Sequence, residues 1–417
     1  MCVAAVGMVT AVQGKRAIVS FKGALQEVSL ALLPHVKIGD HVVVHAGFAA
    51  EIVKDVPKLY QDVVATDARA RQILDAIERE TKNFSGQKIR IMNFCGSHEN
   101  TVVQYGLRDL LPECIELVSG PGCPVCVTAA EEIALGLEVA RRENVTLTTF
   151  GDLIRVPTPW GSLEQLQEEG ADVRVIYDIS QALQLARVSE REIVHFAIGF
   201  ETTAPLTASV IREAQNIDNF SIISSHRVTP PAIEYVLANY QVDAVLCPGH
   251  VAMIIGVEPF RSLFNNRRIP YVISGFEPID LLQGVLFLLQ QLLGKMSANN
   301  NQYSRVVEEK GNELAQSLLT NVFTLTDAYW RGFDILPASR LILRPEYQQF
   351  DAQYRFGLQM PSKPEATETL CICNAILSGA NPRECSLFAK ACTPEHPSGP
   401  CMVSREGACH ISYHNRE

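Results

Sequence analysis

The chain has 417 residues, 47% of them hydrophobic and 20% charged, a composition typical of a soluble globular protein with two or three domains. A net charge of −10 argues against nucleic acid as the main partner, because neutralising phosphates requires a basic surface. We find no basic leader before an apolar segment, no polybasic cluster and no apolar run long enough for a membrane span, so we expect a cytoplasmic protein.

Twelve cysteines are the unusual feature of the composition. In a chain of this size with no secretion signal, cysteines at short spacings serve metal or redox chemistry more often than a disulfide framework. They are unevenly distributed, and six of them fall between Cys371 and Cys409.

The N-terminal residues 1–54 are predicted to form a small β-barrel of short strands. Ala17–Phe21 and His41–His45 carry the β-branched residues that favour strands, with glycine turns between the runs. Residues 55–87 are predicted to be a charged linker and a leading helix, because Asp67–Lys82 has helical periodicity with alternating charge.

From residue 88 onward the pattern changes to strand–loop–helix units, which predicts an α/β fold of parallel sheets covered by helices. The number of strands suggests two such domains, at 88–190 and 191–300, followed by a helical and cysteine-rich region at 301–417. The expected strands are Ile89–Phe94, Ile115–Ser119, Thr146–Phe150, Val173–Tyr177, Ile193–Ile198, Phe220–Ser224, Ala244–Cys247 and Tyr271–Ser274.

Chemically versatile residues repeatedly follow these strands. In open α/β sheets, ligands bind in the crevice beyond the carboxyl ends of the strands, and glycines there allow tight turns and close backbone approach. We therefore expect a functional cleft built from these loops. The segments are Cys95–His98, Gly120–Cys126, Gly151–Asp152, Gly199–Thr203, Ser225–His226, Pro248–His250 and Gly275–Pro278.

The loop Gly-Pro-Gly-Cys-Pro-Val-Cys contains Cys123 and Cys126, three positions apart at the start of a predicted helix. Both thiols can face one ligand, and a helix N-terminus stabilises a thiolate. Reversible disulfide formation, thioredoxin-like exchange and metal ligation compete as functions, while two buried small hydrophobic residues are the structural alternative. No aromatic residue precedes the motif as in many thioredoxins, which favours metal binding with redox capability.

Cys95 and His98 offer a thiolate and either a second ligand or a base, although a lone buried cysteine is common. Glu201 and Glu277 occupy matching Gly-Phe-Glu turns, so they are expected to line one cleft or to mark duplicated halves, with a solvated surface position as the alternative. His226 and His250 can equally be hydrogen-bonded structural histidines.

The C-terminal cysteines fall in a segment with little hydrophobic periodicity, so thiolate ligation is expected to supply part of its stability. Long, irregular spacings suit a [4Fe–4S] cluster better than a structural zinc, which usually uses paired CxxC knuckles, and better than disulfides. At the other end, Cys2 and His45 form a weaker candidate metal pair. The six tail cysteines are Cys371, Cys373, Cys385, Cys392, Cys401 and Cys409.

Together these segments resemble two families. Met1–Ala4 and Val42–Ala49 are similar to the HypC family of hydrogenase-maturation chaperones over residues 1 to about 53, with Val6 where that family usually has proline. From about Tyr60 to the end the chain resembles the HypD family. The matching segments are Cys95–His98, Gly120–Cys126, Phe150–Asp152, Gly199–Thr203, Pro248–Val251, Gly275–Pro278, Asn301–Tyr303, Trp330–Gly332 and Met402–Cys409.

The resemblance implies an assembly scaffold for [NiFe]-hydrogenase with redox activity, rather than a conventional turnover enzyme. It would hold one iron that receives two cyanides and one carbon monoxide, with cyanide arriving from a HypE-like carrier and the product passing to the hydrogenase large subunit. Carried over residue by residue, the iron ligands are Cys95 and Cys2, assisted by His45, with Cys123 and Cys126 nearby. The implied [4Fe–4S] ligands are Cys373, Cys385, Cys392 and Cys409, with Cys401 as a competitor.

Two other functions remain open from the sequence. A cluster-dependent thiol–disulfide or electron-transfer oxidoreductase needs only Cys123, Cys126 and the tail, but it leaves Cys2 and His45 unexplained. A structural zinc protein would use the tail only to fold. The chain has neither the Cys-x3-Cys-x2-Cys run of radical enzymes that use S-adenosylmethionine nor a phosphate-binding Walker loop.

Overall fold

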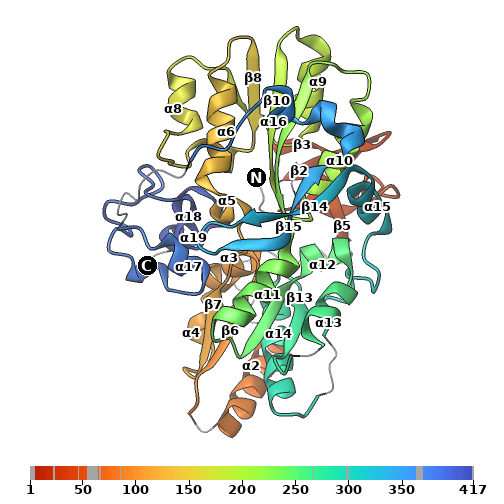
Figure 1. Ribbon diagram of the computed structural model, residues 1–417. Coiled ribbons are helices and arrows are strands. Elements are labelled where there is room, and N and C mark those ends of the chain that lie inside the picture. Colours follow the sequence, from red (N-terminus) through yellow and green to blue (C-terminus); the bar gives the residue numbers. More distant parts are fainter. Residues whose placement is uncertain are drawn as a thin grey trace.

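The computed structural model describes residues 5–21, 24–45, 47–53, 64, 67–84, 86–265, 267–296, 300–362 and 370–415. These residues form a closed β-barrel and two sheets flanked by helices, with the cysteine-rich C-terminal segment packed beside the place where the two sheets meet (Figure 1). No helix among them is both long and apolar enough to cross a membrane.

The N-terminal barrel confirms the sequence prediction. Alternate residues such as Val9, Val19 and Val42 are fully buried, because side chains of a strand point alternately to its two faces. The strands are joined in the order β1-β2-β3-β5-β4, which leaves no free sheet edge. They are β1 (Ala5–Gln13), β2 (Arg16–Phe21), β3 (Ala24–Ser29), β4 (His41–His45) and β5 (Phe48–Val53).

A four-stranded parallel sheet forms the lower half of the body, in the order β13-β12-β6-β7. Helices α2 (Ala68–Thr81) and α14 (Pro278–Leu292) bury their apolar sides with it in one hydrophobic core. Asp67 accepts a hydrogen bond from the Arg69 amide and so caps the leading helix where the sequence predicted its start. The strands are β6 (Ile89–Asn93), β7 (Ile115–Ser119), β12 (Ala244–Pro248) and β13 (Tyr271–Ser274).

The second sheet has six strands in the order β14-β15-β11-β10-β8-β9. Four are parallel, whereas β14 and β15 form an antiparallel hairpin in the region that we expected to be helical and cysteine-rich. The sequence prediction overlooked that hairpin because its strands alternate only partly between buried and exposed residues. The strands are β8 (Val145–Thr149), β9 (Val173–Val175), β10 (Glu192–Gly199), β11 (Phe220–Arg227), β14 (Phe323–Tyr329) and β15 (Ile335–Leu343).

All eight strands predicted between residues 88 and 300 are present, so the α/β class with parallel sheets is confirmed. Each sheet, however, combines strands from both sides of residue 190, because the chain leaves the lower sheet after β7 and returns to it with β12. The sheet boundaries therefore do not follow the expected boundary between the ranges 88–190 and 191–300, and the division into domains stays a prediction.

The remaining helices connect these strands or follow them. They are α3 (Gly96–Gln104), α4 (Leu107–Leu110), α5 (Pro124–Val127), α6 (Ala130–Ala140), α7 (Gly151–Ile154), α8 (Leu163–Glu168), α9 (Ser180–Val188), α10 (Ala204–Glu213), α11 (Thr229–Asn239), α12 (Gly249–Ile255), α13 (Glu258–Phe264), α15 (Glu313–Val322), α16 (Ala352–Arg355), α17 (Cys373–Leu377), α18 (Pro400–Val403) and α19 (Ala408–His414), with short 3-10 turns at Lys82–Phe84, Pro345–Phe350 and Pro382–Glu384.

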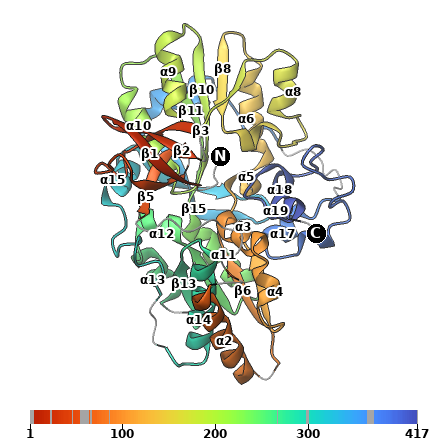
Figure 2. The ribbon, with the colours of Figure 1, turned by 180° about the vertical axis from the view of Figure 1, so that it is seen from behind.

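The barrel packs over the junction of the two sheets, between α10 and α12 and on the side opposite the cysteine-rich segment (Figure 2). Phe48 belongs to the same hydrophobic core as Ile179 of the upper half. Gly47 has φ +87°, and a Cβ there would lie 2.2 Å from the Asp178 Cβ. On the lower half, the Tyr303 hydroxyl donates to the Glu51 carboxylate. The barrel therefore contacts both halves of the body.

A buried ion pair connects α6 to the upper sheet. Glu132 pairs with Arg227, both almost fully buried, and Ser225 donates to the second Glu132 oxygen at 2.6 Å. Burial alone would raise the pKa of Glu132, but the guanidinium groups of Arg227 and Arg340 lower it to about 2. Glu132 is therefore ionised at neutral pH, and its negative charge balances the buried positive charge of Arg227.

We expect Glu132→Gln to lower the free energy of unfolding by about 3–5 kcal/mol at neutral pH, because it leaves the buried Arg227 charge unpaired. Urea denaturation followed by circular dichroism measures this. Glu138→Gln, which breaks the exposed pair with Arg142, is the matched control and should change the stability by less than about 1 kcal/mol. Equal effects of the two substitutions would contradict a role for the buried pair.

Candidate functional site

The loops that carry Cys95 and the CxxC motif lie against each other. Each follows one of two neighbouring strands, β6 and β7, so the parallel pairing brings both loops to the same sheet edge. The Gly96 amide donates to the Gly122 carbonyl at 3.3 Å. A Cβ at Gly122 would lie only 2.4 Å from the Cys95 nitrogen, so glycine is required for this approach.

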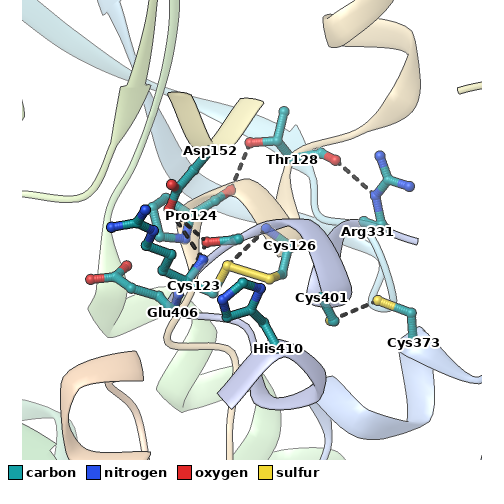
Figure 3. Close-up of a disulfide and its surroundings, with 12 residues drawn as sticks. Cys123, Pro124, Cys126, Thr128, Asp152, Arg331, Cys373, Cys401, Glu406 and His410 are labelled. Carbon is teal, nitrogen blue, oxygen red and sulfur yellow. Dashed lines mark hydrogen bonds between the residues drawn. A yellow bond between two sulfur atoms is a disulfide. The ribbon is translucent and has the colours of Figure 1, made fainter. Parts of the chain in front are cut away.

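Cys123 and Cys126 form a disulfide at the start of α5 (Figure 3). Cys123 is the N-cap residue, and its sulfur accepts a hydrogen bond from the Cys126 amide at 3.1 Å. Pro124 fixes the first helical position, and its carbonyl accepts from the Thr128 hydroxyl at 2.8 Å. Both cysteines are buried, so reagents reach the disulfide only through the loops around it.

The C-terminal segment returns to this place after the whole α/β body has been completed. The Ser404 hydroxyl and the Arg405 amide donate to Asp152 Oδ2, at 3.2 and 3.3 Å, which joins this segment to the loop after β8. The next residue, Glu406, packs on Gly96, where a Cβ would lie 2.5 Å from the Glu406 Cβ. A small cavity here is lined by, among others, Cys123, Cys126, Cys401 and Glu406.

Burial governs protonation at this site. It raises the pKa of the Glu406 carboxyl well above its usual range, and the nearby Asp152 raises it further. Burial also raises the pKa of the Cys95 thiol to about 12; Glu406 adds to the rise, and the backbone amides of Ser97 and His98 oppose it. Cys95 is thus a thiol at neutral pH and needs a cationic partner to become a thiolate. Asp152 belongs to a segment that the sequence predicted to build the cleft, whereas Glu406 was not predicted as a site residue, although it lies within the matched segment Met402–Cys409.

The three candidate histidines make hydrogen bonds and ring contacts inside the protein. His98 is buried, stacks on Phe276 and lies 3.2 Å from the Ser274 carbonyl through Nε2. Burial lowers the pKa of His98 to about 4, so the ring is neutral. His226 contacts the Thr207 hydroxyl at 3.0 Å, and His250 stacks on Phe276. These contacts indicate structural histidines.

The two Gly-Phe-Glu carboxylates cap helices. Glu201 is buried and accepts hydrogen bonds from the Thr229 amide and hydroxyl, at 2.6 and 2.8 Å, at the start of α11. Glu277 forms a capping box with Asp280 at the start of α14 and is 44% exposed. Glu277 therefore caps the helix that follows its own strand, whereas Glu201 binds the start of a different helix, so the matching turns have different contacts. Among the described residues, neither carboxylate is hydrogen-bonded to a thiol.

The tail cysteines gather in one place. The sulfurs of Cys373 and Cys401 are 2.8 Å apart, and a Cβ at Gly399 would lie 3.0 Å from the Cys371 sulfur. Burial raises the pKa of the Cys409 thiol, and the nearby Cys373, Cys371, Cys392 and Cys385 add to the rise. Cys371, which matched no motif in the sequence, is therefore a member of the group.

The donor set fits a thiolate-bound cluster in number, since six cysteines exceed the four thiolates that a [4Fe–4S] cluster requires, and their segment packs into the hydrophobic core of the upper sheet. Within the described part of the chain, however, no three His, Cys, Asp or Glu side chains stand in metal-binding geometry. Ligation therefore requires the thiols to lose their protons and separate. Cys2 lies outside the described residues, and so does the side chain of His45 in β4.

A larger cavity of about 730 Å³ runs along β7, the edge strand of the lower sheet. Ser119 lines this cavity and also the small cavity at the disulfide. The opposite wall is formed by the segment after α17, which includes Gly379 and Arg383. The two cavities therefore meet at Ser119, the last residue of β7.

Comparisons with known proteins agree with this architecture. Residues 68–416 match the family model HypD, described as "Hydrogenase formation hypA family", and residues 1–56 match the HupF/HypC family. The hydrogenase maturation factor HypD of Cupriavidus necator is 42% identical over 344 residues, covering 79% of this chain and 90% of that protein. HypD of Azotobacter vinelandii is 41% identical, and the match covers 85% of this chain and 96% of that protein. HypD of Escherichia coli is 38% identical, and the match covers 86% of this chain and 98% of that protein.

We expect Gly122→Ala to destabilise the protein by about 1–3 kcal/mol, because the new methyl group would collide with the Cys95 backbone, which cannot move aside like a flexible side chain. Thermal unfolding measures the loss. Gly151→Ala is the matched control, since its Cβ would meet only Val175 at an ordinary 3.4 Å. An unchanged midpoint for Gly122→Ala would contradict the close contact of the two loops.

Glu201 gives the stability a predictable dependence on pH. Burial raises the pKa of Glu201 to about 7 despite the hydrogen bonds from Thr229, so its contribution is fully present below about pH 4.5 and is lost as the pH rises through 7. We expect the stability of the wild type, relative to Glu201→Gln, to fall by about 3 kcal/mol over this interval. Denaturant titrations at several pH values measure it, and parallel curves would contradict the assignment.

Proposed function

The chain belongs to the HypD family of hydrogenase maturation factors and carries a HupF/HypC-family segment at its N-terminus, and we propose that it is a scaffold on which the iron group of [NiFe]-hydrogenase is assembled. The iron is the cargo, and it receives two cyanides and one carbon monoxide before it is passed on. The observation that carries the proposal is the contact of the Cys95 loop with the CxxC loop through Gly122.

Cys95 is the proposed iron ligand of the body, with Cys2 and His45 of the barrel as partners. Soft thiolates suit an iron that bears cyanide and carbonyl ligands. Because burial keeps Cys95 protonated, iron binding must displace its proton, and the site should load better as the pH rises.

Cys123 and Cys126 are the proposed source of the electrons that release cyanide. A thiocyanate on the carrier is split by two electrons into a thiolate and cyanide. Oxidation of the dithiol to the disulfide supplies two electrons and two protons, so the exchange balances: the S–C bond breaks, the S–S bond forms and cyanide goes to the iron. The disulfide between these residues is the product state of that reaction.

The tail is proposed to hold a [4Fe–4S] cluster, with Cys373, Cys385, Cys392 and Cys409 as ligands and Cys401 or Cys371 as competitors. Such a cluster supplies electrons one at a time to reduce the disulfide again. Cys401 lines the same small cavity as Cys123 and Cys126, so the tail thiols and the disulfide are neighbours.

The proposed partners are a HypE-like cyanide carrier and the hydrogenase large subunit, all in the cytoplasm. The cavity along β7 is the proposed docking place of the carrier, because it meets the small cavity at the disulfide at Ser119. The HypC-like chaperone is the barrel, which is fused to the body, so its binding to both halves of the body is intramolecular. A short linker raises the effective concentration of such a partner to about the millimolar range.

A second function, that of a cluster-dependent thiol–disulfide oxidoreductase, has one observation in its favour. The disulfide and Cys401 of the tail line one small cavity that Cys95 does not line, so electron exchange between them would not require Cys95. This alternative gives no role to the Cys95 loop or the barrel. It predicts an electron-transfer activity that survives substitution of Cys95, whereas the assembly of an iron–cyanide group would not.

We expect anaerobically purified protein, produced together with a cyanide carrier, to show infrared stretches of cyanide and carbonyl on iron. Cys95→Ala should abolish these bands, because the iron loses its ligand, while the visible absorption of the cluster remains. Cys114→Ala, which removes a half-buried cysteine next to β7, is the control and should retain both signals. Wild-type protein without the infrared bands would leave the oxidoreductase as the better function, and bands that survive in Cys95→Ala would refute the ligand assignment.

A further inference from the structure

Arg331, in the turn between β14 and β15, lies beside Thr128 and on the same side of the disulfide as Cys373 (Figure 3). The Arg331 amide donates to the Val127 carbonyl at 2.8 Å, and Arg331 Nε donates to the Thr128 carbonyl at 2.9 Å. On its other side, a Cβ at Gly332 would lie 3.1 Å from the Asn374 Cα of α17. The turn therefore touches both the helix that carries the disulfide and the helix that begins at Cys373.

The position of this turn is fixed by the residue before it. Trp330 is completely buried, its indole N–H donates to the Ser339 hydroxyl at 2.9 Å, and its ring stacks on Phe200 with centroids 6.0 Å apart. The Trp330 amide also donates to the Asp334 carbonyl at 3.1 Å, which closes the turn. Arg331 thus extends from a rigid support, and its charge is held in one place.

That charge lies close to the tail, because Gly332, the next residue, packs on Asn374, the neighbour of Cys373 in α17. Arg331 Nη2 is buried and has no hydrogen-bond partner among the described residues. A buried donor without an acceptor is unfavourable, which indicates that this guanidinium serves to balance negative charge nearby.

We propose that Arg331 is a positioning residue that holds α5 beside the tail cysteines and stabilises the extra negative charge that the tail acquires when its cluster accepts an electron. The inference rests on the proposed [4Fe–4S] cluster. Reduction adds one electron and breaks no bond, so a nearby fixed cation favours the reduced state and makes the cluster easier to reduce. The same residue keeps the electron acceptor, the Cys123–Cys126 disulfide, next to the donor.

The test is the midpoint potential of the cluster in the whole protein, followed by electron paramagnetic resonance during an anaerobic redox titration. Arg331→Met keeps the length of the side chain but removes its charge, and we expect it to disfavour the reduced state about tenfold, which is about 59 mV towards more negative potential. Arg331→Lys keeps the charge and should retain most of the wild-type potential.

Arg344→Met is the matched control. Arg344 also donates through Nε to backbone carbonyls, those of Thr320 and Phe323, but it lies at the other end of the hairpin. The control loses the same charge and should leave the potential unchanged. A shift shared by Arg344→Met and Arg331→Met would reflect net charge alone and would overturn the inference.

The remaining outcomes are also decisive. An unchanged potential in Arg331→Met overturns the electrostatic role. If Arg331→Met does not assemble the cluster, the inference requires that Arg331→Lys does so near the wild-type potential; failure of both variants means that Arg331 is only a structural brace. A wild-type protein that binds no iron–sulfur cluster refutes the proposed function itself, which is a separate result from a cluster that is insensitive to Arg331.

Discussion

The approach of Gly122 to the Cys95 backbone is the contact on which the site depends. A side chain of any other residue would need the space that the Cys95 nitrogen and Cα occupy. The contact forms because β6 and β7 are adjacent parallel strands, whose carboxyl ends deliver both loops to one edge. Because Gly122 has no Cβ, the candidate iron ligand Cys95 can lie close to the Cys123–Cys126 disulfide.

The other groups of the site lie near the carboxyl ends of β6 and β7 but come from segments that are distant in the sequence. The loop after β8 contributes Asp152, and the C-terminal segment contributes Glu406 and Cys401. The hairpin turn at Arg331 reaches α5 from a third direction. Because these groups come from both sheets and from the tail, the site exists only when the whole α/β body has folded. The barrel, which packs on the opposite side, contacts both halves and can stabilise their relative orientation.

Burial, rather than a helix N-terminus, sets the protonation state of the buried thiol and carboxyl groups. Cys95 lies at the start of α3, where a helix dipole lowers a thiol pKa, yet burial and Glu406 outweigh that effect. Burial likewise raises the pKa of the Cys409 thiol in the tail. Metal loading at both places is therefore linked to proton release. A fixed positive charge such as Arg331 is valuable in these surroundings because low polarity strengthens its field.

The sequence by itself determined the features that depend on local pattern. The strand–loop–helix pattern identified eight strands of the body, β-branched runs separated by glycine turns identified the barrel, and the spacing of the cysteines identified the CxxC motif and the tail. It also placed Cys95 and Cys123 after neighbouring strands, although their contact was only an inference. Local patterns are readable because the period of a helix or strand appears within a few residues.

Only the tertiary structure decided which strands pair and which polar groups meet. The return of the chain from β11 in the upper sheet to β12 in the lower one leaves no mark in the periodicity, so the expected boundary at residue 190 does not follow the sheets. Thr229, 28 residues further on, donates two hydrogen bonds to Glu201, a contact that no local pattern indicates. The positions of Glu406 and Arg331 were likewise not predictable from the sequence, because they result from long-range contacts that depend on the packing of the whole chain.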